Sequence, residues 1–266
     1  MICVFDCETI PDSRALREVY GYEGDDKEVS ITAQNTQLEK SGTSFLPVNF
    51  HQVVCISAVI CDDFGRFEKV STIEGENEGE IIAKFLNFID KKNPRLISFN
   101  GRGFDLPMLM IRAMAYNLSC HAYFDDNDAK LNKNKWNNYR DRYSGNFHLD
   151  LLDFISEFRS VSGLSLNSLC KTYGMPGKYD VHGDDVMELF YDDKIDKINE
   201  YCESDTLNTY LLFLKYELLR GKILLSDYAD NLAIMKENLL KNKAQMGYTE
   251  VFVKFIDDEI AKVSQK

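Results

Sequence analysis

The sequence predicts an α/β protein in which a mixed sheet is flanked by helices. Three observations support this fold class. Short apolar runs typical of strands come early in the chain, strand and helix patterns alternate in the middle, and helical periodicity dominates the remainder. Because 44% of the 266 residues are hydrophobic, the chain can also bury a sizeable core.

Five apolar runs predict the strands, and a turn at 62–65 is expected to join the second strand to the third. The strands are predicted at Met1–Phe5, Val53–Ile60, Phe67–Ile73, Leu96–Phe99 and Phe147–Leu151. Helical periodicity predicts helices at 78–91, from Leu106 onward, and at 164–173, 183–191, 195–219 and 227–264. Pro107 suits the first turn of its helix, and Gly221 is expected to end the long one.

Two polar stretches, 11–50 and 119–146, interrupt this pattern, and we interpret both as insertions. No linker or internal repeat divides the chain. Residues 1–266 are therefore predicted to form a single domain with a helical C-terminal extension from about residue 222.

The composition excludes several protein classes. No run approaches the roughly 18 apolar residues of a membrane helix, and the N-terminal sequence lacks the basic start and apolar core of a signal peptide. The seven cysteines show no zinc-ligand spacing and are expected to be free thiols, so we expect a soluble, cytoplasmic protein with no membrane partner. The 31 basic and 43 acidic residues give a net charge of −12, which disfavours broad wrapping of nucleic acid but allows a local basic groove.

The first candidate site is the pair Asp6 and Glu8, where the first apolar run ends. Alternation along a strand points both side chains to the same face. Two neighbouring carboxylates repel each other and are costly to desolvate unless a cation joins them, and a hard divalent metal ion suits oxygen ligands. The alternative is a solvated pair of carboxylates at a strand end.

The second candidate site lies where a predicted strand passes into a helix, in the segment 100–105. Asp105 stands at the carboxyl edge of the predicted sheet, where ligands bind in open α/β folds. The alternative role for Asp105 is that of a helix cap. Gly101 and Gly103 predict either a tight turn or close approach by a ligand.

The third candidate site lies in the long predicted helix. A spacing of four places Tyr201 and Asp205 on one face, continued by Thr209, whereas Leu207 and Leu211 belong to a separate apolar stripe. We therefore expect this helix to pack by one face and to offer the phenol and the carboxylate on another. The alternative is an ordinary surface aspartate beside a half-buried tyrosine.

The order and spacing of these residues resemble the three motifs of the DEDD superfamily, the ribonuclease-H-like (DnaQ-like) 3′-to-5′ exonucleases. Along the chain the motifs are Asp6-x-Glu8, Asn100-x3-Phe104-Asp105 and Tyr201-x3-Asp205. The tyrosine indicates the DEDDy branch, because the other branch would carry histidine at the position of Glu200. The chain looks like the proofreading exonuclease domain of family B DNA polymerases, occurring as a stand-alone protein without a polymerase aspartate motif.

The resemblance implies a ribonuclease-H-like fold, with a mixed five-stranded sheet flanked by helices and extra C-terminal helices. It also implies a two-metal-ion mechanism in which carboxylates hold two divalent cations, Mg²⁺ or Mn²⁺. The implied metal ligands are Asp6, Glu8, Asp105 and Asp205, and the implied catalytic residues are these four with Tyr201. Tyr201 would orient the attacking water and need not ionise.

Five further residues are candidates for substrate binding: Thr9, Asn100, Phe104, Trp136 and Lys178. Asn100 and Phe104 match family positions that contact the terminal nucleotide, and a phenylalanine face can stack on a base. Core packing is the alternative for Phe104, and simple solvation the alternative for Lys178. Trp136 lies in 129–140, whose basic and aromatic residues suit either a loop that grips single-stranded nucleic acid or a solvated lysine-rich loop. Asp150 is expected to play a supporting role.

Together these observations predict a metal-dependent 3′-to-5′ exonuclease that acts on single-stranded 3′ ends, DNA favoured, and releases nucleoside 5′-monophosphates. Three alternatives stay open. They are the same chemistry on RNA or short oligonucleotides, a catalytically inactive nucleic-acid-binding module with the same fold, and a non-nuclease α/β protein with coincidental motif matches. The presence of all four carboxylates and of Tyr201 argues against the inactive module.

Overall fold

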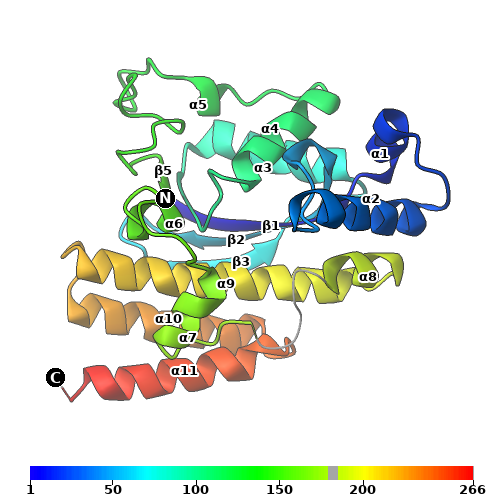
Figure 1. Ribbon diagram of the computed structural model, residues 1–266. Coiled ribbons are helices and arrows are strands. Elements are labelled where there is room, and N and C mark those ends of the chain that lie inside the picture. The colour runs from blue at the N-terminus through cyan, green and yellow to red at the C-terminus, as the bar shows by residue number, and fades with distance from the viewer. Residues whose placement is uncertain (179–184, 266) are drawn as a thin grey trace.

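A five-stranded mixed sheet forms the centre of the computed structural model, which describes residues 1–178 and 185–265 (Figure 1). Its strand order is β3-β2-β1-β4-β5, and β1 runs parallel to β4 and antiparallel to β2. The strands are β1 Ile2–Pro11, β2 His51–Cys61, β3 Phe67–Thr72, β4 Arg95–Ser98 and β5 His148–Asp150. The predicted fold class is therefore confirmed.

Helices cover both faces of the sheet (Figure 1). On one face lie α3 (Glu78–Lys92) and α4 (Asp105–Ala115), and on the other lies the long α9 (Ile195–Leu219), backed by α10 (Leu225–Asn242) and α11 (Tyr248–Val263). Strand alternation separates the two cores, because Ile2 and Val4 of β1 pack in the cluster that contains the α9 to α11 side chains, whereas Cys3 and Phe5 pack with α3 and α4.

The stretch 11–50, which we interpreted as a polar insertion and for which we predicted no helix, contains two helices, α1 (Ser13–Tyr20) and α2 (Asp26–Ser41), and the short η1 (Val48–Phe50). Asp25 and Glu28 form a capping box at the start of α2, and Gly21 and Gly42 end the two helices in the left-handed conformation. The helices have a small core of their own, which comprises Leu16, Val29, Ala33, Leu46 and Phe50.

The remaining helices follow the prediction with local differences. The helix predicted at 227–264 is two helices, because the chain turns between α10 and α11 at 243–247. The predicted 183–191 helix is α8 (Val186–Tyr191), and residues 183 and 184 lie outside the described part of the chain. Three further helices in the middle of the chain are short: α5 His121–Phe124, α6 Leu151–Ile155 and α7 Leu166–Thr172.

The centre of α9 is buried on every side, contrary to the expectation of one apolar face and one open face. All residues from Tyr201 to Leu214 are buried, because the helix lies between the sheet and the α10–α11 pair. Several of its polar side chains are accordingly bonded inside the protein, although the buried Ser204 Oγ has no partner among the described residues. Glu203, for example, accepts from Lys243 Nζ at 2.7 and 2.9 Å and from the Tyr248 hydroxyl at 2.6 Å.

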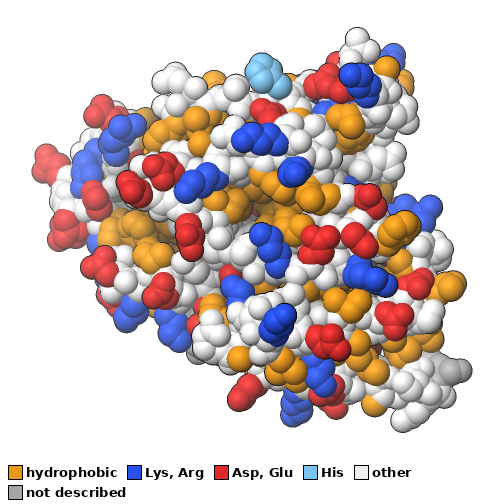
Figure 2. All heavy atoms as spheres, turned by 180° about the vertical axis from the view of Figure 1, so that it is seen from behind, with side chains coloured by type: hydrophobic (Ala, Val, Ile, Leu, Met, Phe, Trp, Pro, Cys, Tyr) orange, Lys and Arg blue, Asp and Glu red, His pale blue; other side chains and the backbone are white. Residues whose placement is uncertain are grey.

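The surface and the cysteines match the composition. Seen from behind, acidic and basic side chains are intermingled, and this face shows no continuous basic region over the described residues (Figure 2). All seven cysteines are free thiols, as predicted, and all are buried. None of the helices in the described ranges has both the length and the apolar character that crossing a membrane requires.

Candidate active site

Asp6 and Glu8 lie within β1, beyond the end of its pairing with β4. We expected them at the end of a strand, but β1 pairs with β2 along its whole length and continues to Pro11. Its pairing with β4 stops at Val4. The two carboxylates therefore lie just outside the carboxyl end of β4, where open α/β sheets form their ligand crevice.

The other two predicted carboxylates reach the same place from two helices. Asp105 is the first residue of α4 and is 5% exposed, and Asp205 lies on α9 and is 7% exposed. Burial raises the pKa of Asp6 well above its usual range, and the charges of Asp105 and Asp205 raise it further. The pKa of Glu8 is raised by burial, then by Asp6 and Asp205. The structure thus brings together the four residues that the three motifs predict.

This cluster fits a hard divalent cation. Burial raises the pKa of Asp105 to about 7, although hydrogen bonds from its own backbone and from Cys7 oppose the shift. Oxygen atoms of Asp6 and Glu8 lie within 4.8 Å of each other and of the Cys202 Sγ. Within the described ranges no salt bridge reaches any of the four carboxylates. These carboxylates therefore have no direct ion-pair partner among the described residues, and oxygen ligands of this kind suit Mg²⁺ or Mn²⁺.

Tyr201 lies beside these carboxylates, one turn before Asp205 on α9. The Asp205 carboxylate lies close enough to the Tyr201 hydroxyl for each group to affect the pKa of the other. Burial, followed by the negative charges of Asp205 and Glu8, raises the pKa of Tyr201 far above 10, so the phenol keeps its proton. It is a hydrogen-bond donor at neutral pH.

Lys178 is the cation that the structure places beside this group. Its Nζ lies 5.2 Å from the centre of the Tyr201 ring, and its charge acts to lower the pKa values of Glu8 and Asp205 against the effect of burial. Asn208, also on α9, fixes the preceding backbone. Its amide oxygen accepts from the Gly177 N–H at 2.9 Å, and its amide nitrogen donates to the Gly177 carbonyl at 3.1 Å.

Asn100 and Phe104 lie in the loop that leads to Asp105, and Phe104 and Thr9 both contact His51. Asn100 has a positive φ of 69°, and its N–H donates to Asp150 at 2.9 Å, which gives Asp150 a supporting contact. The half-buried Phe104 ring packs edge-on against His51 and Phe45, with ring centres 4.9 and 5.0 Å apart. The Thr9 hydroxyl lies 2.9 Å from His51 Nδ1.

Neither interpretation of 129–140, as a loop that grips nucleic acid or as a solvated loop, holds for two of its residues. The Lys133 Nζ is buried and donates to Asn93 Oδ1 and to the Ala122 carbonyl, both at 2.8 Å. Tyr139 is fully buried, and its hydroxyl donates to the Pro94 carbonyl at 2.7 Å. Both side chains therefore anchor the loop. Trp136, in contrast, is 71% exposed.

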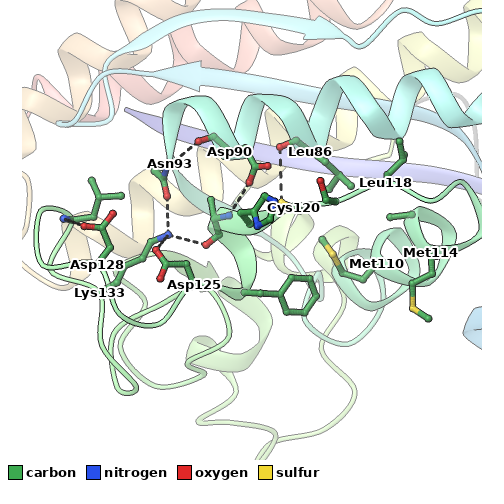
Figure 3. A pocket seen from close by; sticks show the side chains of 16 residues that line it. Leu86, Asp90, Asn93, Met110, Met114, Leu118, Cys120, Asp125, Asp128 and Lys133 are labelled. Carbon is green, nitrogen blue, oxygen red and sulfur yellow. Dashed lines mark hydrogen bonds and ion pairs between the residues drawn. The ribbon is translucent and has the colours of Figure 1, made fainter.

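A cavity of about 930 Å³ lies elsewhere, between α3, α4 and the 119–133 segment (Figure 3). Met110, Met114 and Leu118 give it an apolar wall, and Lys133 with its hydrogen bonds lies at one end. None of the four carboxylates lines this cavity. Its volume therefore gives no evidence about the chemistry at β1 and α9.

Comparison with known proteins identifies the family. A family model described as "Predicted 3'-5' exonuclease related to the exonuclease domain of PolB" matches residues 43–256. The chain belongs to this family. The match to this PolB-related exonuclease family includes Asp105, Tyr201 and Asp205 but begins after Asp6 and Glu8. The first pair is joined to the others by the fold, through the packing of β1 against α9.

Two viral DNA polymerases are similar to this family member in sequence. That of Orgyia pseudotsugata multicapsid polyhedrosis virus is 28% identical over 151 residues, which are 53% of this chain and 15% of the polymerase. That of Choristoneura fumiferana nuclear polyhedrosis virus is 26% identical over 192 residues, 66% of this chain and 19% of the polymerase. The chain thus spans less than a fifth of the length of these relatives.

A solved structure is also similar. The family B DNA polymerase from the hyperthermophilic archaeon Pyrobaculum calidifontis aligns with a TM-score of 0.49 and 17% identity, covering 92% of this chain and 29% of that one.

Some residues around the candidate site were not singled out from the sequence. Asn208 follows Asp205 by three positions, so helical spacing alone could have indicated it. Cys202 and Arg159 carried no such signal. Arg159 donates from Nη2 to Asn100 Oδ1 at 2.6 Å across 59 residues of sequence, a contact that only the fold creates.

Proposed function

We propose that this chain is a metal-dependent 3′-to-5′ exonuclease that hydrolyses phosphodiester bonds at the 3′ end of single-stranded nucleic acid, with DNA the favoured substrate, and releases nucleoside 5′-monophosphates. The observation that carries the proposal is the convergence of four repelling carboxylates, three of them buried and Asp6 partly buried, in a member of an exonuclease family. Asp6, Glu8, Asp105 and Asp205 would hold two divalent cations, Mg²⁺ or Mn²⁺. When bound, these cations would supply the nucleophile and stabilise the charge that develops on the leaving oxygen.

The chain's own polar groups would position the reactants. Tyr201 stays protonated beside Asp205, so its hydroxyl can orient a water molecule for attack on the phosphorus. Lys178 would contact a non-bridging oxygen of the scissile phosphate, since its ammonium group lies beside Tyr201. Asn208 fixes the backbone of Gly177, and the Lys178 N–H donates to Asn167 Oδ1 at 3.1 Å, which limits the entropy lost when the substrate binds.

The terminal nucleotide would lie against Asn100, Phe104 and Thr9. Phe104 is only half-buried, so one part of its ring can stack on a base while the rest packs against His51. Stacking without hydrogen-bond readout tolerates any base, as a general exonuclease requires. Trp136, which is 71% exposed, would stack on a base farther along the strand.

The test is a cleavage assay with 5′-labelled single-stranded DNA and RNA in Mg²⁺, Mn²⁺ or EDTA, comparing wild type with Asp6→Ala. A ladder of shortened products that requires metal and disappears in Asp6→Ala supports the proposal. Binding with no shortening in either metal would instead identify an inactive binding module. The relative rates on the two substrates decide whether DNA or RNA is preferred.

A further inference from the structure

Three arginines gather on one buried carboxylate beside the loop that leads to Asp105. Arg142 forms two bonds to Asp153, from Nε to Oδ2 and from Nη2 to Oδ1, each 2.8 Å long. Arg159 Nε donates to Asp153 Oδ1, also at 2.8 Å, and Arg102 Nε lies 3.9 Å from Oδ2. The Asp153 side chain is 2% exposed. Three guanidinium charges therefore share a single buried carboxylate.

The neighbouring Asp150 does not restore the balance of charge. Its carboxylate accepts from the backbone N–H groups of Asn100 and Arg102 and caps the start of α6. Even when Asp150 is counted with Asp153, two carboxylates face three arginines. This local excess of positive charge occurs in a chain whose net charge is −12.

A strained turn holds one of these arginines in place. Glu157, Phe158 and Arg159 have φ values of 49°, 55° and 72°, three consecutive left-handed residues that are not glycine. Each of these conformations is unfavourable and persists only where surrounding contacts impose it. Phe158 supplies such contacts, since its ring packs edge-on against Phe154 and Tyr143 at 5.1 and 4.8 Å. Strain of this kind is concentrated at functional sites.

The turn directs Arg159 toward the loop between β4 and α4. Its Nη2 donates to Asn100 Oδ1 at 2.6 Å. A Cβ at Gly103 would lie 3.2 Å from this Nη2 and 2.4 Å from Asn100 Oδ1, so a larger residue at 103 would displace the contact. The loop that ends at Asp105 and the arginine cluster are therefore built to fit each other.

The two outer arginines keep donors for a ligand. The side chains of Arg142 and Arg159 are 37% and 41% exposed. Within the described ranges, the hydrogen bonds of these two side chains use Nε and Nη2, and Nη1 makes none. A planar guanidinium whose other donors are already fixed loses little freedom when it binds an oxyanion, and its geometry matches phosphate.

We propose that Arg142 and Arg159 bind a backbone phosphate of the single strand whose 3′ end lies at the four carboxylates, an assignment that rests on the proposed exonuclease function. The same chemistry would suit the phosphate of a released nucleoside 5′-monophosphate. The strand is the favoured source, because both arginines bond to Asp153, Arg159 also bonds to Asn100, and neither bonds to the carboxylates at which the reacting phosphate would lie.

The first test measures binding of a fluorescent 12-nucleotide single-stranded DNA in EDTA, which prevents metal-dependent shortening, at several salt concentrations. Arg142→Ala and Arg159→Ala are each expected to weaken binding about tenfold and to reduce the slope of log K against log salt by about 0.7, the value for one phosphate contact on a single strand. Arg17→Ala is the matched control, because Arg17 lies on α1, is 34% exposed and pairs with Asp26 at 2.7 Å. It should bind like wild type.

The second test separates phosphate binding from a structural role. In Mg²⁺, the two variants should raise KM more than they lower kcat, and the loss in kcat/KM should be larger on the 12-nucleotide strand than on a dinucleotide. Arg159→Lys, which keeps the charge, should recover part of the salt slope. A competition arm adds deoxyadenosine 5′-monophosphate. The monophosphate could displace the strand from wild type and do so far less well from Arg159→Ala. In that case the released nucleotide and not the strand would be the ligand, and the proposal would fail.

The failures of the two proposals can be told apart. Wild-type protein that neither binds nor shortens the strand would refute the exonuclease function and the arginine assignment with it. Wild-type protein that does both, with Arg142→Ala and Arg159→Ala showing unchanged affinity and salt slope, would refute only the arginine assignment. Circular dichroism melts of each variant show whether the turn still folds.

Discussion

The Nζ of Lys178 lies 5.2 Å from the centre of the Tyr201 ring, although 23 residues separate them. The reciprocal amide bonds between Asn208 and Gly177 produce this placement, because they fix the backbone one residue before the lysine. Gly177 has a φ of 61°, and a Cβ there would come within 2.7 Å of Asn167 Oδ1. The position of Lys178 thus depends on a glycine that tolerates both the dihedral angle and the close contact.

Replacement of this lysine tests its contact with the reacting phosphate. We expect Lys178→Met to lower kcat/KM on single-stranded DNA by about 10- to 100-fold, because a charge-assisted bond to the phosphate is lost. Initial rates on a labelled oligonucleotide measure the change. Lys84→Met is the control, since that side chain is 56% exposed and weakly paired with Glu80 at 3.9 Å. Equal rates for wild type and Lys178→Met would remove Lys178 from the site.

Removal of the Tyr201 hydroxyl tests its role in orienting water. We expect Tyr201→Phe to lower kcat by roughly a hundredfold, because a positioned donor is lost, and to leave the metal ions bound. Isothermal titration with Mn²⁺ measures metal binding. Tyr210→Phe is the control on the same helix, as that hydroxyl donates to the Gly65 carbonyl at 2.9 Å, away from the carboxylates. Loss of Mn²⁺ binding in Tyr201→Phe would contradict the assigned role.

The buried His148 makes stability depend on pH. Arg102 Nη2 donates to its Nδ1 at 3.1 Å, so the neutral ring carries its proton on Nε2 and donates to Ser98 Oγ at 2.8 Å. Burial, reinforced by the Arg102 charge, lowers the pKa of His148 to about 3 from the usual 6.5. Between these two values the unfolded chain binds a proton that the native protein does not, and stability falls as the pH falls.

The measurement is urea unfolding at pH 7, 6, 5 and 4 for wild type and His148→Gln. The free energy of unfolding of wild type relative to the variant should decrease below pH 6.5 by up to about 1.4 kcal/mol per pH unit. Parallel pH profiles would show that His148 is not the group responsible.

Glu78 joins α3, α4 and β2 through one buried carboxylate. It accepts from Arg112 Nε at 2.7 Å, from the Tyr116 hydroxyl at 2.7 Å and from the Val53 N–H at 2.7 Å. Arg112 also pairs with Asp12. We expect Glu78→Gln to lower the free energy of unfolding by about 3 to 5 kcal/mol, because Arg112 then loses a charged partner in a buried site. Denaturant unfolding measures the change, and the exposed Glu80→Gln should cost less than about 1 kcal/mol.

The single tryptophan offers a direct report on substrate contact. Trp136 is 71% exposed, with Lys135 Nζ 4.8 Å from its ring centre. If it stacks on a base as proposed, single-stranded DNA will quench its fluorescence, and Trp136→Ala will weaken binding by about 1 to 3 kcal/mol. A titration in which the emission is unchanged while the strand binds would show that the loop does not touch the strand.

Local sequence predicted most of the secondary structure, and it contained one signal that we did not use. The long helix 195–219 was predicted with its observed bounds, because twenty-five residues of helical periodicity leave little ambiguity. The two helices within 11–50 were missed because their polar composition outweighed the capping pattern of Asp25 and Glu28. A capping pattern indicates the start of a helix more strongly than a polar composition indicates a loop.

The sequence by itself determined the sheet-and-helix class and the motifs that name the four carboxylates and Tyr201, since these depend on spacing along one strand or one helix. Only the tertiary structure decided that α9 is buried all round, that Lys133 anchors a loop, and that Lys178 and Arg159 lie beside the predicted site. The physical reason is that burial and electrostatic contact depend on distances in space, and residues far apart in the chain acquire those distances only when the sheet and its helices pack together.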